Sequence, residues 1–273
     1  MVTSFTFATQ PAPTLHTFYL TWPMTAASKV IEAWQAWAPT ADARLWSTLK
    51  ALGGHKHPGG PILLMSGTWT GPSGSLNAQL AGLLNHCPAP SVRSTTTKSY
   101  RQAMASYAGC SSIPVSRCHT GPGGSLDREA FGATSHVAYA KLTSSGIADL
   151  LGQVEHAQTT GLLEAGISMD ALGGKVRDVG PADTAFVHRN ALMTVQYTAT
   201  FASGTGTPGA ADSYVRGFRS AMTPHWGRHA YVNYSDKTIG NYRRAYFGAN
   251  AARLAQVRTT YDPQRFFTQP QDY

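Results

Sequence analysis

The sequence has no hydrophobic run long enough to cross a membrane, and its first residues lack the charged-then-apolar pattern of a signal peptide. We therefore expect no membrane partner. Charged residues are also scarce, because Asp, Glu, Lys and Arg make up only 13% of the 273 residues. The net charge of +8 comes from scattered basic residues with no run of five or more, which argues against a nucleic-acid partner.

Several catalytic motifs are missing as well. There is no Gly-x-Ser-x-Gly elbow to hold a hydrolase nucleophile, and there is no P-loop. The stretch Gly121-Pro-Gly-Gly124 has a proline where a phosphate cradle would need a backbone N–H. His55 and His57 have the spacing of some metal ligands, but no third ligand stands near them in the sequence. We expect a solvated loop there and no metal site.

Cysteine is limited to Cys87, Cys110 and Cys118, and no Cys-x-x-Cys pair indicates a zinc or redox site. Cys110 and Cys118 lie eight residues apart in a loop that contains Ser and Pro. They could form a disulfide or stay as two thiols, and the sequence leaves both possibilities open.

Hydrophobic residues make up 42% of the chain, enough for a packed core, and their spacing alternates between helix and strand. Helical stripes are predicted near 27–37, 76–84, 100–107, 147–154 and 211–222. Strands are predicted at 15–22, 43–52, 61–70, 135–141, 168–172, 184–189 and 192–201. Because each helix has one apolar stripe, the helices can cover only one side of the strands. The sequence predicts an α+β fold whose antiparallel sheet carries helices on one face and Gln196 on the uncovered face.

The most specific stretch lies near the C-terminus. Tyr231-Val-Asn-Tyr234 alternates like a short strand, so Tyr231 and Asn233 would point to one face and Tyr234 to the other. Residues 242–247 are predicted as a helical turn stopped by Gly248, and a second helix is expected to end before Pro263. A strand followed by two short helices is the expected shape.

This segment resembles the C-terminal segment of the berberine-bridge-enzyme-like FAD-linked oxidoreductases. The shared pattern is Tyr-x-Asn-Tyr, Tyr-(Tyr/Phe)-Gly-x-Asn, Arg-Leu and (Tyr/Val)-Asp-Pro-x-x-x-Phe, and every fixed position is present between Tyr231 and Phe267. In that family, the stretch that matches Val-Thr-Ser-Phe-Thr-Phe follows the flavin-binding domain. The resemblance implies that residues 1–10 are a remnant strand of an absent FAD-binding domain, 11–225 a substrate domain and 226–273 the C-terminal segment, whose strand and short helices belong with the missing flavin domain.

The resemblance also implies roles for single residues. Tyr234 matches the tyrosine that acts as a base on the substrate hydroxyl, and Tyr231 and Asn233 would contact FAD. A phenol with an ordinary pKa of about 10 is a poor base at neutral pH unless a cation, a hydrogen-bond donor or a reacting partner favours the phenolate. Substrate contacts would come from Gln196, Thr194 and Arg189. Thr194 stands where some family members have lysine, which leaves the substrate class open.

We therefore expect the substrate-binding part of an FAD-dependent oxidoreductase that oxidises an alcohol, sugar or secondary metabolite by hydride transfer to the flavin. The implied partners are a small-molecule substrate and a missing or separately encoded FAD-binding domain, with weak or no FAD binding by this chain alone. Two alternatives stay open. One is a flavin-free module that keeps the pocket for binding or non-redox cyclisation, and the other is a structural partner of a separate flavin domain.

Overall fold

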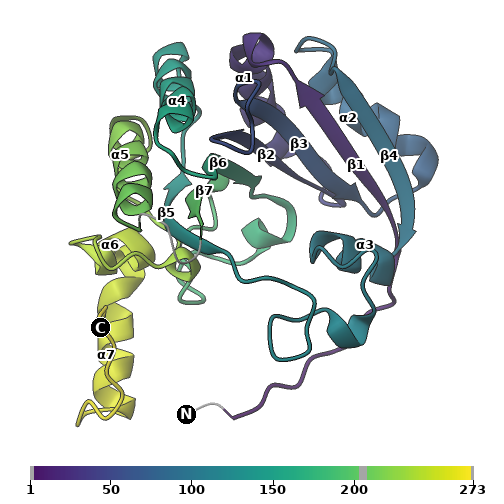
Figure 1. Ribbon diagram of the computed structural model, residues 1–273. Coiled ribbons are helices and arrows are strands. Elements are labelled where there is room, and N and C mark those ends of the chain that lie inside the picture. Colours follow the sequence, from purple (N-terminus) through teal and green to yellow (C-terminus); the bar gives the residue numbers. More distant parts are fainter. Residues whose placement is uncertain (1–2, 203–207, 272–273) are drawn as a thin grey trace.

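A seven-stranded antiparallel sheet forms the centre of the computed structural model, which describes residues 3–202 and 208–271 (Figure 1). The strand order is β4-β1-β3-β2-β6-β7-β5. Their bounds are β1 Thr14–Trp22, β2 Leu45–Gly53, β3 Ile62–Trp69, β4 Val92–Ser99, β5 Ala130–Ala138, β6 Glu164–Ala171 and β7 Met193–Phe201. The predicted antiparallel α+β fold is confirmed. The central pair, β2 with β6, joins strands β1–β4 to strands β5–β7, which come later in the chain.

Four helices pack on one face of the sheet and bury the apolar stripes that predicted them. They are α1 (Ala27–Trp37), α2 (Leu76–Leu84), α4 (Ser144–His156) and α5 (Pro208–Trp226). In α1 the side chains of Val30, Ile31 and Trp34 are fully buried, and the Trp34 indole N–H donates to Ser47 Oγ at 3.1 Å. From the sheet, Leu49, Met65, Ile167 and Tyr197 enter the same core.

The opposite face of the sheet is polar and carries cross-strand rows of Thr, Ser and ionisable side chains. Asp170 on β6 pairs with Thr48 on one side and Thr194 on the other, and Ser168 pairs with Lys50 and Gln196. Gln196 therefore lies on the face that the four helices leave uncovered, as predicted. The short helix α3 (Tyr100–Tyr107) is the exception to the one-sided packing, because the Tyr107 hydroxyl reaches the Thr68 hydroxyl on this polar face.

Three predicted strands are wrong, and one strand was not predicted. Residues 3–10 have no regular secondary structure and no sheet partner, residues 184–189 form turns and loop, and Val232–Tyr234 is a turn of 3-10 helix. None of these stretches finds a neighbouring strand to supply the backbone hydrogen bonds that a strand needs. The missed strand is β4, an edge strand that pairs only with β1 and has no buried residue. The sequence also predicts a Gly- and Thr-rich loop at 203–209; residues 203–207 lie outside the described part, and residues 208 and 209 belong to α5.

The C-terminal segment has a small core of its own, separate from the main one. Ala230, Ile239, Ala245, Tyr246 and Phe247 are buried together, and α6 (Tyr242–Phe247) ends at Gly248, whose φ of +50° favours glycine. The second helix, α7 (Ala251–Tyr261), ends before Pro263 and buries none of its side chains fully. Both predicted helices are confirmed. The domain limits at residues 10 and 225 stay predictions.

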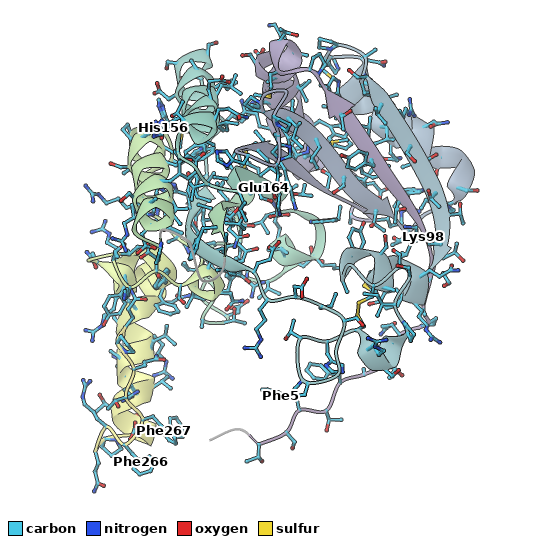
Figure 2. The ribbon with its side chains drawn as sticks, in the orientation of Figure 1. Phe5, Lys98, His156, Glu164, Phe266 and Phe267 are labelled. Atoms are coloured by element: carbon cyan, nitrogen blue, oxygen red, sulfur yellow. A yellow bond between two sulfur atoms is a disulfide. The ribbon has the colours of Figure 1, made fainter. Side chains whose placement is uncertain are left out.

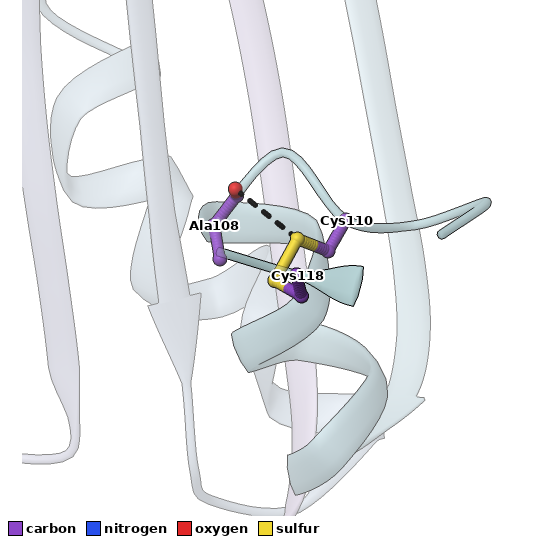
Figure 3. The surroundings of a disulfide bond; sticks show 3 residues. All are labelled: Ala108, Cys110 and Cys118. Atoms are coloured by element: carbon purple, nitrogen blue, oxygen red, sulfur yellow. Dashed lines mark hydrogen bonds between the residues drawn. A yellow bond between two sulfur atoms is a disulfide. The ribbon is translucent and has the colours of Figure 1, made fainter. Parts of the chain in front are cut away.

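Cys110 and Cys118 form a disulfide in the long connection between α3 and β5, with their Cα atoms 5.9 Å apart (Figure 3). The Cys110 Sγ atom lies 3.6 Å from the carbonyl oxygen of Ala108, just after the last turn of α3. Of the two possibilities that the sequence left open, the structure shows the disulfide. Cys87 is a free thiol.

Candidate active site

A cavity of about 730 Å³ opens on the polar face of the sheet. Its walls come from three separate stretches: residues 38–46 before and within β2, residues 170–194 from the end of β6 to the start of β7, and residues 231–247 of the C-terminal segment. Its volume falls in the range of small-molecule sites, roughly 300 to 1,000 Å³. The site therefore exists only where all three stretches meet.

The Tyr231–Tyr234 turn brings three predicted site residues to this cavity. The Tyr231 backbone N–H donates to Ser135 Oγ of β5 at 3.1 Å, and the Tyr234 N–H donates to the Tyr231 carbonyl at 3.0 Å, which closes the turn. Because this backbone is a turn, Tyr231, Asn233 and Tyr234 all line the cavity, and the predicted split between two strand faces is wrong. Asn233 Nδ2 donates to the Tyr231 hydroxyl at 2.8 Å, and the two tyrosine rings meet edge to face.

Asp170 is the site residue that the sequence analysis missed. Burial raises the pKa of its carboxyl, whereas hydrogen bonding by Thr48 and Ser168 and the charge of Lys50 lower it. Burial also raises the pKa of Tyr234, and the charge of Asp170 raises it further. The charged neighbour that acts on the phenol is thus an anion, which disfavours the phenolate. Strand alternation could have found Asp170, because it shares a face with Ser168 just before Gly173 and Gly174.

The three predicted substrate residues are placed differently. Thr194 lines the cavity opposite Asp170 in the strand register. Arg189 also lines it, with Nη2 donating to Thr184 Oγ1 at 2.7 Å and the guanidinium over the Phe186 ring, while its buried Nε has no hydrogen-bond partner. Gln196 lies farther along the same sheet face, beyond the cavity lining.

The histidines of the glycine-rich turn do not form a metal site with the residues around them. His57 Nε2 lies 3.0 Å from Glu164 Oε2, a contact that the sequence spacing did not reveal. Within residues 3–202 and 208–271, no three His, Cys, Asp or Glu side chains come together as metal ligands. Nor does any helix in these ranges have the length and apolar character to cross a membrane.

Comparison with known proteins shows which proteins this chain is similar to. A family described as "Berberine and berberine like" matches residues 230–272. The uncharacterised FAD-linked oxidoreductase YgaK of Bacillus subtilis is 28% identical over 98% of this chain and 54% of YgaK. A chitooligosaccharide oxidase of Gibberella zeae is 34% identical over 38% of this chain and 23% of its own. The solved structure of Physcomitrella patens BBE-like 1 aligns with a TM-score of 0.79 at 21% identity, covering 95% of this chain and 54% of that one.

The α+β fold of this chain is thus the fold of the part of the solved BBE-like 1 structure that aligns with it. Residues 230–272 match the berberine family, and two relatives that align along nearly the whole chain are FAD-linked oxidoreductases at 28% and 29% identity. The chain spans about half the length of these full-chain relatives, 54% of YgaK and 56% of the Bacillus subtilis protein YvdP.

Proposed function

We propose that this chain supplies the substrate side of an FAD-dependent oxidoreductase that acts on an alcohol or sugar hydroxyl. The observation that carries the proposal is that Tyr234 and Asp170 line the same cavity, where the charge of Asp170 helps to raise the pKa of Tyr234. The hydroxyl-rich sheet face around them suits a polyhydroxylated substrate. One of the relatives is named as a chitooligosaccharide oxidase, which favours a sugar.

The raised pKa of Tyr234 defines how the pair would handle a proton. A phenol that stays protonated at neutral pH cannot act as a base unless its own proton has somewhere to go. The Asp170 carboxylate, with a pKa raised by burial, is the acceptor at hand. We infer that Tyr234 takes the proton of the substrate hydroxyl while its own proton passes to Asp170. Bound FAD would supply the hydride acceptor, since redox chemistry belongs to the cofactor.

The cavity fits the flavin ring and no more of the cofactor. Tyr231, Asn233 and Phe186 offer aromatic and amide surface for a planar ring, and the unpartnered buried Nε of Arg189 is a donor without an acceptor. Among the residues that line the cavity, Gly173 and Gly174 lead only into a five-residue 3-10 helix, Gly174–Asp178, and no α-helix begins there to hold a pyrophosphate. The remainder of FAD would be held by an FAD-binding domain.

Exposed aromatic side chains mark where such a domain would dock. Phe5 and Phe7 are 74% and 79% exposed, and Tyr261 and Phe266 beyond the sheet are 83% and 82% exposed. The N-terminal segment and α7 extend from the body of the molecule in the same direction (Figures 1 and 2). Exposed aromatic side chains on both the N-terminal segment and the C-terminal region are suited to a partner surface that would cover them.

The test joins this chain to the N-terminal part of YgaK that it does not match, and measures flavin reduction by a panel of sugars after anaerobic rapid mixing. The parent fusion should bind flavin and be reduced by at least one sugar. Tyr234→Phe should slow reduction by about 10² to 10⁴ with flavin content unchanged, the range for losing a positioned acid–base group.

Tyr231→Phe is the matched control, because it removes one phenolic oxygen from the same turn without touching the proposed proton path. The Tyr231→Phe substitution should change the flavin absorbance spectrum more than it changes the rate of flavin reduction. An unchanged reduction rate in Tyr234→Phe would remove that tyrosine from the catalytic role.

A further inference from the structure

A second hollow, of about 470 Å³, lies where the C-terminal end of α5 meets the start of α6. It shares no lining residue with the cavity of the candidate active site. Three arginines, Arg219, Arg228 and Arg244, line it together with His229 and Thr238, and none of its lining residues is acidic. The hollow is thus a concentration of positive charge on a chain that has few charges elsewhere.

Arg219 is held in place by the backbone around the hollow. Its Nε donates to the Ser135 carbonyl at 3.0 Å, and its Nη2 donates to the Arg228 carbonyl at 3.3 Å. Burial lowers the pKa of this guanidinium, and the nearby charge of Arg228 acts in the same direction, partly offset by Asp236. The side chain is therefore fixed before any ligand arrives, which reduces the entropy lost on binding.

Arg228 and Arg244 have no counter-charge. Neither side chain forms an ion pair or hydrogen bond with any residue in 3–202 or 208–271, whereas exposed Arg216 pairs with Asp212 and Lys175 with Asp178. His229 Nδ1 is buried without a hydrogen-bond partner, and burial together with the charge of Arg244 lowers the pKa of this ring. The cations repel one another, and an anion would relieve that repulsion.

We propose that this hollow binds a phosphate group, either as free inorganic phosphate or as part of a nucleotide. Guanidinium groups bind phosphate oxygens through paired N–H donors, and a doubly charged anion can engage more than one arginine at once. The Thr238 hydroxyl on the same wall already donates to Asp236 Oδ1 at 2.6 Å, so the histidine ring is the neutral group there that can contact the anion. This site is independent of the oxidation proposed for the first cavity.

Isothermal titration of the full chain with inorganic phosphate, pyrophosphate and ADP, in chloride buffer of constant ionic strength, tests the proposal. Saturable binding is expected, and Arg228→Ala with Arg244→Ala should weaken it about tenfold for each guanidinium removed. Both arginines are exposed, so the double variant should keep the parent circular dichroism spectrum and melting temperature without ligand. Arg253→Ala, on the exposed face of α7, controls for the loss of a positive charge and should bind as the parent does.

A second readout is the His229 ring, whose titration by NMR should move to higher pH when phosphate is present, because a bound anion favours the imidazolium. ADP binding well above pyrophosphate would assign the site to a nucleotide, and equal binding would assign it to the free anion. Equal affinity in the parent and the double variant, or the same loss in Arg253→Ala, would overturn the proposal.

Discussion

Asp170 illustrates how a single site residue can work against the stability of its own fold. Its carboxyl sits on the polar sheet face, and burial there raises its pKa above the ordinary value of 3.8. A carboxyl whose pKa is higher in the folded state than in the unfolded state costs stability once the pH rises above the unfolded value. The same raised pKa makes the carboxylate a better proton acceptor than an exposed one.

Asp170→Asn should therefore raise the melting temperature of the isolated chain at pH 7. The gain should shrink as the pH falls towards 3.8 and below, where the parent carboxyl is protonated in both states. Calorimetry over this pH range measures it, with exposed Asp178→Asn as the control. In the flavin-containing fusion, the same change should slow reduction of the flavin. A lower melting temperature at pH 7 would contradict the electrostatic argument.

His136 shows the opposite dependence on pH. Its ring is fully buried on the helix-covered side of the sheet, with Nδ1 2.8 Å from the Tyr197 hydroxyl, and burial lowers its pKa from 6.5 to about 3. The unfolded chain then binds a proton that the folded chain does not. The stability that this creates is complete above pH 6.5 and is lost as the pH falls towards 3.

Between pH 6.5 and pH 5, His136 alone should cost the fold about 2 kcal/mol. Urea unfolding of His136→Gln should show a flatter dependence on pH over this interval, although the variant is less stable at neutral pH because it loses the Tyr197 contact. His55→Gln in the exposed glycine-rich turn should keep the parent dependence. Identical pH dependence in His136→Gln and the parent would show that the buried ring is protonated in the folded state.

Sequence patterns found the site residues that belong to a motif and missed the one that does not. Tyr231, Asn233 and Tyr234 share a short stretch with a characteristic spacing, so their presence at one site could be predicted. Asp170 enters the site through the pairing of β6 with β2 and β7, which depends on strands distant in the chain. The charged neighbour of Tyr234 could not be predicted from spacing for the same reason, because strand pairing places Asp170 in the cavity.

At the scale of elements, helices with one apolar stripe were predictable and exposed strands were not. An amphipathic stripe indicates which face of a helix packs against a core, so the helix can be predicted from its own sequence. β4 has no buried residue, and its identity as a strand comes only from pairing with β1. Residues 184–189 show the converse, because a strand-like composition near the cavity meets no partner and forms turns.

The disulfide is the element whose removal has the most direct effect on the unfolded state. Cys110→Ser with Cys118→Ser opens a short covalent loop and should lower the free energy of unfolding by about 2 to 3 kcal/mol, from regained chain entropy. Urea titration of the parent, oxidised and with reductant, measures the effect. Adding reductant to the double variant should change nothing further. Equal free energies of unfolding for the oxidised and the reduced parent would show that the disulfide does not restrict the unfolded chain.

For the whole molecule, the open cavity predicts weak or absent flavin binding. Side chains of this cavity could enclose the flavin ring, but the residues that line it give no cradle for the pyrophosphate of FAD. The purified chain should be colourless, and added FAD should be lost on gel filtration, whereas the fusion with the N-terminal part of YgaK should retain it. Absorbance at the flavin bands decides this. A yellow chain with one flavin per molecule would show that this half binds the cofactor without help.

The junction between β2 and β6 has a further consequence, for the order in which this chain can assemble. The strands before α3 pair among themselves, as do the strands after the disulfide, and only β2 with β6 joins the two groups. Contacts between residues so far apart in sequence close large loops and form slowly. Because the cavity straddles that junction and also needs the Tyr231–Tyr234 turn, its walls meet late in folding. The candidate active site is therefore complete only after both groups of strands and the C-terminal segment have packed together.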